Sequence, residues 1–373
     1  MRRLLPFVVL ALVPVPSAAL ADGCPPSSCG ISSSAPPGSS LVFVRSGGQR
    51  GSLQAYGAST GTRRFTLPRG VLSADSSTFV SSAAPQLIRT TVVRYDAATG
   101  KIARGWSLPG RWDAAAISAD GRHHLLAQYR RRTIVLRSGG LRAVLPATYD
   151  VEALSPDGHK VFLVHWKRNG YDLRQLDLVT HRLAATRLAE PDEKMSGTAV
   201  NAVATRDGHW LLTLYSKPDG HSFIHALDLR TALAHCIDLT LTGDFFALGS
   251  TGLALSPDEG KLYLANPYLG LVTTVDLAKL EITRVVRFAG LSVKNVNMLI
   301  GPSAALTPNG RMLAFTGQKS VWLYDTAFGI VRQPASVATS ITGVGFRPDG
   351  RRLLALQRHG PPVFLDAATG ERH

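Results

Sequence analysis

The chain has 373 residues, 45% of them hydrophobic, and its 41 basic against 26 acidic residues give a net charge of +15. In a cytosolic protein, a surplus of this size would point to nucleic acid. The N-terminus argues against that partner because it carries the marks of an exported protein. After that segment, no apolar run reaches the roughly 20 residues that a membrane-spanning helix needs, so no transmembrane helix is expected.

The first residues have the order of a secretory leader. Two arginines precede a mostly apolar run over residues 4–16, and Ala19-Leu20-Ala21 forms a small-residue cleavage site. This order predicts a signal peptide over residues 1–21, and its removal leaves a net charge of +13. The expected location is therefore secreted or the extracytoplasmic cell envelope. A retained anchor, or a lipoprotein attached at Cys24, is the alternative.

Residues 22–40 are rich in Gly, Ser and Pro, which predicts a flexible linker. Cys24 and Cys29 lie in it and could form a disulfide in an oxidising compartment, with two free thiols as the alternative. A metal site is disfavoured, because two thiols without a nearby His leave tetrahedral coordination incomplete. The third cysteine, Cys236, lies in an apolar stretch and is expected to be a buried thiol.

Seven short segments in the rest of the chain share one turn pattern, in most copies a hydroxyl residue, then Pro or Ala, Asp or Asn, and Gly. Apolar runs flank each copy, and the spacings are 45, 37, 50, 51, 51 and 40 residues. Asp or Asn caps its own backbone, Pro presets φ, and Gly accepts a left-handed conformation, so each copy predicts a hairpin turn. The copies are Ser73-Ala74-Asp75-Ser76, Ser118-Ala119-Asp120-Gly121, Ser155-Pro156-Asp157-Gly158, Thr205-Arg206-Asp207-Gly208, Ser256-Pro257-Asp258-Glu259, Thr307-Pro308-Asn309-Gly310 and Arg347-Pro348-Asp349-Gly350.

A second turn follows 16 to 21 residues after the first, directly after an apolar strand that ends with Asp. The clearest copies are Asp96–Gly100 and Asp366–Gly370. Each repeat therefore predicts four strands, a to d, with the first turn between a and b and the second between c and d. Units of this length and content are typical of a β-propeller, in which stacked sheets cover one another around an axis. The expected fold class is all-β, a single β-propeller of four-stranded blades over residues 41–373.

The sequence predicts the number of blades less directly than the fold. The mean repeat of about 46 residues divides the 333 residues from 41 to 373 into about 7.3 units, which favours seven blades. Eight candidate b–c hairpins favour eight, the extra one pairing Leu41–Arg45 with Leu53–Tyr56. A seven-bladed ring would close by mixing strands from both termini in one blade, which hides an exposed edge. Seven is preferred, with eight kept open.

The turns resemble those of secreted bacterial propellers with Tyr-Val-Thr-Asn repeats, which are WD-like. The best match is Leu262-Tyr263-Leu264-Ala265-Asn266 followed by Val275-Asp276. The stretch from Glu190 to Met195, together with Phe223–Asp228 and Cys236–Leu239, is similar to a family of secreted actinobacterial proteins with such repeats. The resemblance implies the fold and export, and it implies no chemistry.

The topology also indicates where a ligand would bind. Both kinds of tight turn lie on one face of the ring, so the variable b–c and d–a loops lie on the other, and long loops on a rigid scaffold often carry binding residues. The b–c loops are rich in cations, which grip carboxylate or phosphate, and in aromatic rings. The alternative is a polar, solvated rim. The predicted ligand-binding residues are Arg130, Arg131, Arg132, Trp166, Lys167, Arg168, Tyr215, Lys217 and Tyr268.

No catalytic signature is present, neither Gly-x-Ser-x-Gly nor His-Glu-x-x-His, and no cofactor or metal site is expected. The preferred function is a secreted or envelope-associated binding or scaffold module for a protein or an anionic envelope ligand. The alternatives are a propeller hydrolase or lactonase with its site at the tunnel mouth, and an electron-transfer protein. Two or more carboxylates converging in the tunnel would favour the hydrolase, whereas a tunnel lined by small apolar residues would favour the scaffold.

Overall fold

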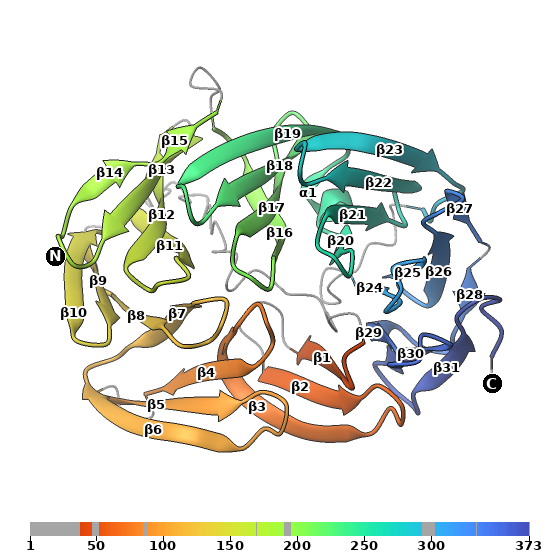
Figure 1. Ribbon diagram of the computed structural model, residues 1–373, viewed down its shortest axis with the longest axis horizontal. Helices are drawn as coiled ribbons and strands as arrows, with labels where there is room; N and C mark the ends of the chain where they lie inside the picture. Colours follow the sequence, from red (N-terminus) through yellow and green to blue (C-terminus); the bar gives the residue numbers. More distant parts are fainter. Residues whose placement is uncertain are drawn as a thin grey trace, which may run out of the picture.

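The computed structural model describes residues 38–46, 52–84, 88–168, 170–189, 195–292, 303–332 and 334–372. The predicted signal peptide, Cys24 and Cys29 lie outside the described residues. The strands form seven sheets arranged in a ring, antiparallel apart from one short parallel pair in the fourth sheet, with one edge of each sheet toward the centre (Figure 1). The prediction of an all-β propeller with four-stranded blades is confirmed. Among the described residues the single α-helix is α1 (Phe245–Leu248).

The sheets follow one another in chain order. The first contains β1 (Leu41–Ser46), β2 (Ser52–Gly57), β3 (Arg63–Leu72), β4 (Thr78–Ala83), β5 (Arg89–Asp96) and β6 (Ile102–Pro109). The second contains β7 (Asp113–Ile117), β8 (His124–Tyr129), β9 (Thr133–Ser138) and β10 (Leu141–Pro146). The third contains β11 (Tyr149–Leu154), β12 (Lys160–Lys167), β13 (Gly170–Asp177) and β14 (Leu183–Ala185).

The remaining four sheets complete the ring. The fourth contains β15 (Arg187–Leu188), β16 (Thr198–Ala204), β17 (Trp210–Ser216), β18 (His221–Asp228) and β19 (Leu233–Thr242). The fifth contains β20 (Gly252–Leu255), β21 (Lys261–Asn266), β22 (Leu271–Asp276) and β23 (Glu281–Arg287). The sixth contains β24 (Ala304–Leu306), β25 (Met312–Gly317), β26 (Ser320–Asp325), β27 (Ile330–Val331) and β28 (Ala335–Ser336). The seventh contains β29 (Ile341–Phe346), β30 (Arg352–Gln357) and β31 (Val363–Asp366).

Strand β3 explains why the sequence suggested both seven and eight units. Its first part, residues 63–69, pairs with β2, and its last part, residues 70–72, pairs with β4. One strand therefore closes the unit β1–β2 and opens the unit β4–β6. Counted by continuous sheets, the ring has seven blades. The first sheet contains two of the eight predicted hairpins, including the extra one, β1–β2.

The ring closes by packing, so the expected mixing of terminal strands in one sheet is wrong. Among the described strands, β29, β30 and β31 pair only with one another, apart from the single bridge between Leu365 and Arg372. Instead, Val42 and Val44 of β1 share a buried apolar cluster with Leu354 and Leu356 of β30. Because β3 already covers the outer edge of β2, no C-terminal strand is needed there.

The repeated turns have one hydrogen-bonding scheme. In the first copy, the Ser73 hydroxyl donates to Asp75 at 2.5 Å and accepts from the Thr78 amide at 3.0 Å, while Asp75 accepts from the Ser77 amide at 2.9 Å. The same pattern recurs at Ser118, Ser155 and Ser256, and Thr307 with Asn309 reproduces it. Local side-chain chemistry thus forms the first turn, as the sequence predicts.

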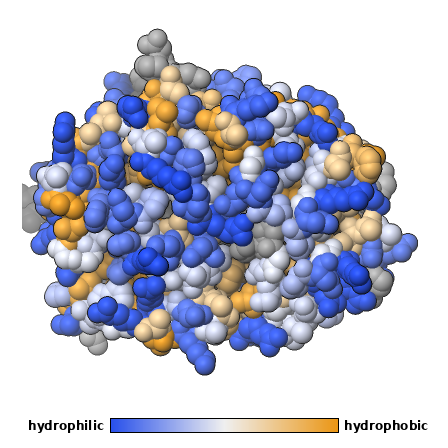
Figure 2. All heavy atoms as spheres, in the orientation of Figure 1, coloured by the Kyte–Doolittle hydropathy of each residue, from blue (hydrophilic) through white to orange (hydrophobic). Residues whose placement is uncertain are grey.

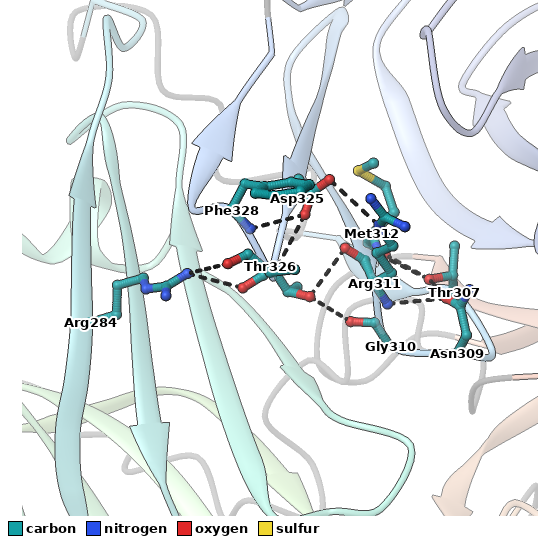
Figure 3. A network of polar contacts seen from close by, with 10 residues as sticks. Arg284, Thr307, Asn309, Gly310, Arg311, Met312, Asp325, Thr326 and Phe328 are labelled. Carbon is teal, nitrogen blue, oxygen red and sulfur yellow. Dashed lines mark hydrogen bonds and ion pairs between the residues drawn. The ribbon is translucent and has the colours of Figure 1, made fainter.

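Figure 3 shows how the two turns of the sixth sheet are joined to each other and to the fifth sheet. The Thr326 hydroxyl, in the second turn, donates to the carbonyl oxygens of Gly310 and Arg311 in the first, at 2.8 and 3.1 Å. Arg284 of β23 donates to the Thr326 carbonyl oxygen at 3.0 Å. Hydrogen bonds therefore link the turns both within a sheet and between neighbouring sheets. The face of the ring that carries the first and second turns is called the turn face below, and the opposite face is called the loop face.

Candidate functional site

The loop between β8 and β9 presents three consecutive arginines, all exposed. Arg130 donates to the Gln128 side-chain oxygen at 2.7 and 3.1 Å. Within the described part of the chain, none of Arg130, Arg131 and Arg132 has a carboxylate partner. Three guanidinium groups on one loop are therefore available to an anion.

The neighbouring loop, between β12 and β13, divides its residues between two roles. Lys167 forms an ion pair with Asp172 at 2.6 Å, and Arg168 is exposed with no ion pair among the described residues. Trp166 is half-buried: its indole nitrogen donates to Asp150 at 2.7 Å and its ring meets the edge of Tyr171. Trp166 thus supports the loop, while Arg168 is free to meet a ligand.

The loops between β17 and β18 and between β21 and β22 offer fewer contacts to a ligand. Lys217 lies 3.3 Å from Asp238 and 4.9 Å above the Phe223 ring, so its charge is already engaged. Tyr215 is a correction to the predicted set. It is 1% exposed and stacks on Tyr171 and Phe223, so it belongs to the core between the third and fourth sheets.

Tyr268 is also removed from the predicted surface. It is 8% exposed, and burial raises the pKa of its phenol, against the effect of a hydrogen bond with Gln318. Its neighbour Asn266 explains the local fold: the Asn266 side-chain oxygen accepts from the amides of Tyr268 and Leu269. The aromatic rings in these loops are therefore largely structural, and the cations remain as the candidate contacts.

Charge is distributed unevenly between the two faces. Six aspartates lie in the first turns and six in the second, and Glu259 also lies in a first turn, so at least thirteen of the chain's 26 acidic residues lie on the turn face. Some arginines on that face form ion pairs there, for example Arg206 with Glu259 at 2.9 Å and Arg230 with Asp207 at 2.6 Å. Arg63 and Arg64, beside a second turn, have no ion pair among the described residues. On the loop face, Arg130, Arg131, Arg132 and Arg168 have no ion pair among the described residues. Figure 2 shows one face, on which hydrophilic side chains predominate and apolar ones are scattered.

The structure adds a central cavity that the sequence did not reveal. A cavity of about 120 Å³ lies where the inner strands β3, β7, β11, β16 and β20 meet, on the side of the first turns. Its walls are mostly Ala, Leu and Val, with Ser73, Ser76, Glu152 and Asn201 as the polar exceptions. Glu152 is the one acidic residue among the described residues that line it, and its side chain is fully buried.

This lining separates the two main functional hypotheses. Converging carboxylates were the expected mark of a hydrolase, and small apolar walls were the mark of a scaffold. The cavity has small apolar walls and a single carboxylate. Across the described ranges, no three His, Cys, Asp or Glu side chains are grouped so that they could hold a metal ion, and no helix is long and apolar enough to cross a membrane. The cavity therefore has the small apolar walls that were expected of a scaffold.

Two buried residues near the cavity were missed by sequence reasoning. Glu152 of β11 and His225 of β18 are both fully buried, with 3.7 Å between Glu152 Oε1 and His225 Nδ1. They come from different sheets, so no local motif joins them. The one available signal was the pair of carboxylates, Asp150 and Glu152, in the short inner strand Tyr149–Leu154.

Comparison with known proteins supports the fold alone. No protein-family model and no curated protein matches the chain. Among solved structures, it is similar to the Dos1 propeller at 14% identity over 92% of this chain and 93% of that one, with a TM-score of 0.54. It is also similar to dihydro-heme d1 dehydrogenase NirN, solved in complex with DHE, at 16% identity over 91% of this chain and 73% of that one, with a TM-score of 0.55. The protein is therefore a β-propeller, and these comparisons show its fold and nothing of its function.

Proposed function

We propose that this protein is an exported β-propeller that acts as a binding module, and that its loop face binds anionic groups of the cell envelope. The observation that carries the proposal is the set of arginines on that face that have no carboxylate partner among the described residues: Arg130, Arg131, Arg132 and Arg168. Guanidinium forks bind phosphate and carboxylate bidentately. The propeller supplies the rigid support, because the two loops extend from neighbouring sheets.

Export is the second part of the proposal. It is supported by the charged start, the apolar run over residues 4–16 and the cleavage pattern before Asp22. In that compartment the abundant polyanions are envelope polymers and phospholipid headgroups, and both present phosphate. The chemical group that both kinds of polyanion share is therefore a repeated phosphate monoanion, which the arginines would bind mainly through charge.

The test compares two double charge reversals in the full-length protein. Arg131→Glu with Arg168→Glu removes two unpaired cations from the loop face. Arg63→Glu with Arg64→Glu makes the same charge change at exposed positions beside a turn on the opposite face. Binding to phosphatidylglycerol vesicles and to soluble polyphosphate distinguishes the two sources of phosphate.

We expect the loop-face variant to bind about ten-fold or more weakly, because each exposed contact contributes about 1 kcal/mol and reversal adds repulsion. Binding should also weaken steeply between about 50 and 300 mM salt. Equal losses in the two variants would show that net charge, and not the loop face, attracts the ligand. Binding to neither probe by the unaltered protein would reject the anionic ligand.

A further inference from the structure

The first two sheets hold most of the net charge of the chain. Residues 41–146, which supply these sheets, contain 16 Lys and Arg against four Asp and Glu, a net charge of +12 out of +15. Three of the four carboxylates, Asp75, Asp96 and Asp120, belong to the repeated turns and so lie on the turn face. The fourth, Asp113, is half-buried on the inner strand β7. The loop face of these two sheets therefore presents cations with little opposing charge.

Three loops on this part of the loop face are joined to one another. The Gly110 amide, between β6 and β7, donates to the Ile88 carbonyl oxygen, just before β5, at 2.7 Å. Gly110 also lies against the Gln128 side chain of β8, because a Cβ added to Gly110 would come within 2.8 Å of the Gln128 amide nitrogen. Gln128 in turn accepts from Arg130 at 2.7 Å. The neighbouring sheets (Figure 1) thus share one continuous surface at this point.

This surface combines cations with exposed apolar side chains. Ile88 and Tyr129 are 68% and 50% exposed. Arginines adjoin them in the same three loops, and all are exposed and have no ion pair among the described residues. They are Arg89, Arg111, Arg130, Arg131 and Arg132. Together with Ile88 and Tyr129 these arginines are called the docking patch below.

Another exposed apolar pair on the loop face has different surroundings. Phe245 and Phe246 of α1 are 38% and 52% exposed. Asp244, also exposed, directly precedes them and caps the helix, and the exposed Asp219 lies in the loop between β17 and β18. Carboxylates near these rings would oppose an anionic surface. Apolar exposure and unopposed positive charge therefore coincide at the docking patch and not at α1.

This combination of side chains matches the surface of an anionic bilayer. Arginine attracts the phosphates of lipid headgroups, while an amphipathic tyrosine ring and an aliphatic side chain leave water for the headgroup region. A soluble polyphosphate offers the same charge and no apolar phase, so it would leave Ile88 and Tyr129 in water.

We propose that the docking patch seats the protein on an anionic phospholipid bilayer, with Ile88 and Tyr129 in the headgroup region and the surrounding arginines on lipid phosphates. The inference rests on the proposed anion binding by the loop face, and it names the bilayer as the source of the phosphate.

The test measures co-sedimentation of the full-length protein with vesicles of phosphatidylglycerol and phosphatidylcholine, beside its affinity for soluble polyphosphate. Ile88→Ser with Tyr129→Ser removes the apolar part of the docking patch and keeps every charge. Phe328→Ser with Ile330→Ser is the matched control, because these residues are 68% and 57% exposed at the second turn of the sixth sheet, on the turn face.

We expect the docking-patch variant to bind vesicles about ten-fold or more weakly, and to bind polyphosphate as the unaltered protein does. The control variant should bind both probes unchanged. Vesicle affinity that is unchanged in the docking-patch variant, equally reduced in the control, or reduced in step with polyphosphate affinity would overturn the bilayer contact and leave phosphate binding intact. Binding of polyphosphate without any binding of vesicles would do the same. Binding of neither probe by the unaltered protein would reject the proposed function and this inference together.

A second measurement applies even if the double variant fails to fold. Tyr129→Trp places a fluorescent ring in the docking patch, and Ile330→Trp places one on the turn face. Vesicles with brominated acyl chains should quench the fluorescence of Tyr129→Trp more than that of the unaltered protein, and should quench Ile330→Trp no more than the unaltered protein. Equal quenching of all three proteins would place the docking patch outside the bilayer and overturn the proposal.

Discussion

Arg206 and Glu259 join the first turns of two neighbouring sheets. The Glu259 carboxylate accepts from the Arg206 backbone amide at 3.0 and 3.1 Å and from its Nε at 2.9 Å, while Nη2 donates to the Pro257 carbonyl oxygen at 2.7 Å. Sheets four and five therefore meet through charged hydrogen bonds as well as through their apolar faces. A charged pair held by several hydrogen bonds contributes more than an isolated surface ion pair.

The first prediction concerns this contact. Replacing Arg206 and Glu259 by Ala, singly and together, should give a coupling free energy of about 0.5–1 kcal/mol in urea denaturation. The matched control is the cycle between Lys279 and Glu281, an exposed pair 3.7 Å apart at the start of one strand. A coupling at Arg206 no larger than at this control would contradict the proposed role.

The second prediction tests how the ring closes. A Cβ added to Gly345 of β29 would overlap the Val42 side chain of β1. Gly345→Ala should therefore lower the free energy of unfolding by about 1–3 kcal/mol, and Val42→Ala should recover part of this loss in the double variant. Gly105→Ala is the control, because the nearest atom to its added Cβ is 4.0 Å away. If Gly345→Ala and Gly105→Ala unfold alike, β1 does not pack on β29 as described.

The sequence predicted what local chemistry determines and missed what distant contacts determine. The turns at Ser118 and Ser155 were predictable, because each is completed by hydrogen bonds within five residues. Tyr215 was misplaced because its position beside a loop gave no sign of the rings of Tyr171 and Phe223 across it. Strand β3 pairs with β2 along its first part and with β4 along its last part. This pairing depends on how two units align with each other, and the amino-acid composition gives no sign of it.

The third prediction concerns acid stability. Hydrogen bonds from the Ser256 hydroxyl and then from the Gly260 amide hold the pKa of Asp258 below its usual 3.8, with burial opposing them. A carboxyl whose pKa is lower in the folded state stabilises the fold above its unfolded pKa, and this stabilisation is lost as pH falls through the folded pKa. Asp120, Asp157 and Asp207 also have lowered pKa values; burial raises them, and hydrogen bonds to the turn outweigh it.

The free energy of unfolding should therefore fall below about pH 4, as the aspartate carboxylates of these turns are protonated. Asp258→Asn should keep the turn, because Asn309 occupies the same place in the sixth sheet and accepts the Arg311 amide at 3.1 Å. At neutral pH the variant should lose about 1 kcal/mol or less. Its unfolding free energy, measured from about pH 6 to pH 2.5, should then fall less steeply than that of the unaltered protein. Parallel curves would show that Asp258 does not contribute to the acid sensitivity.

The fourth prediction concerns the link between the two turns of one blade (Figure 3). Thr326→Val keeps the shape of the side chain and removes the hydroxyl that donates to Gly310 and Arg311. The two carbonyl oxygens would each lose one partner, so the free energy of unfolding should fall by about 1–2 kcal/mol. Thr66→Val on β3 is the control, since Thr66 is exposed and its loss of a hydroxyl should change stability by less than about 0.5 kcal/mol. Hydrogen exchange should show faster opening of the amides of Arg311 and Thr326 in the Thr326→Val protein, while the turn at Asp120 keeps its protection. Equal stability of the two variants, or faster exchange in every blade, would show that the hydroxyl does not join these turns.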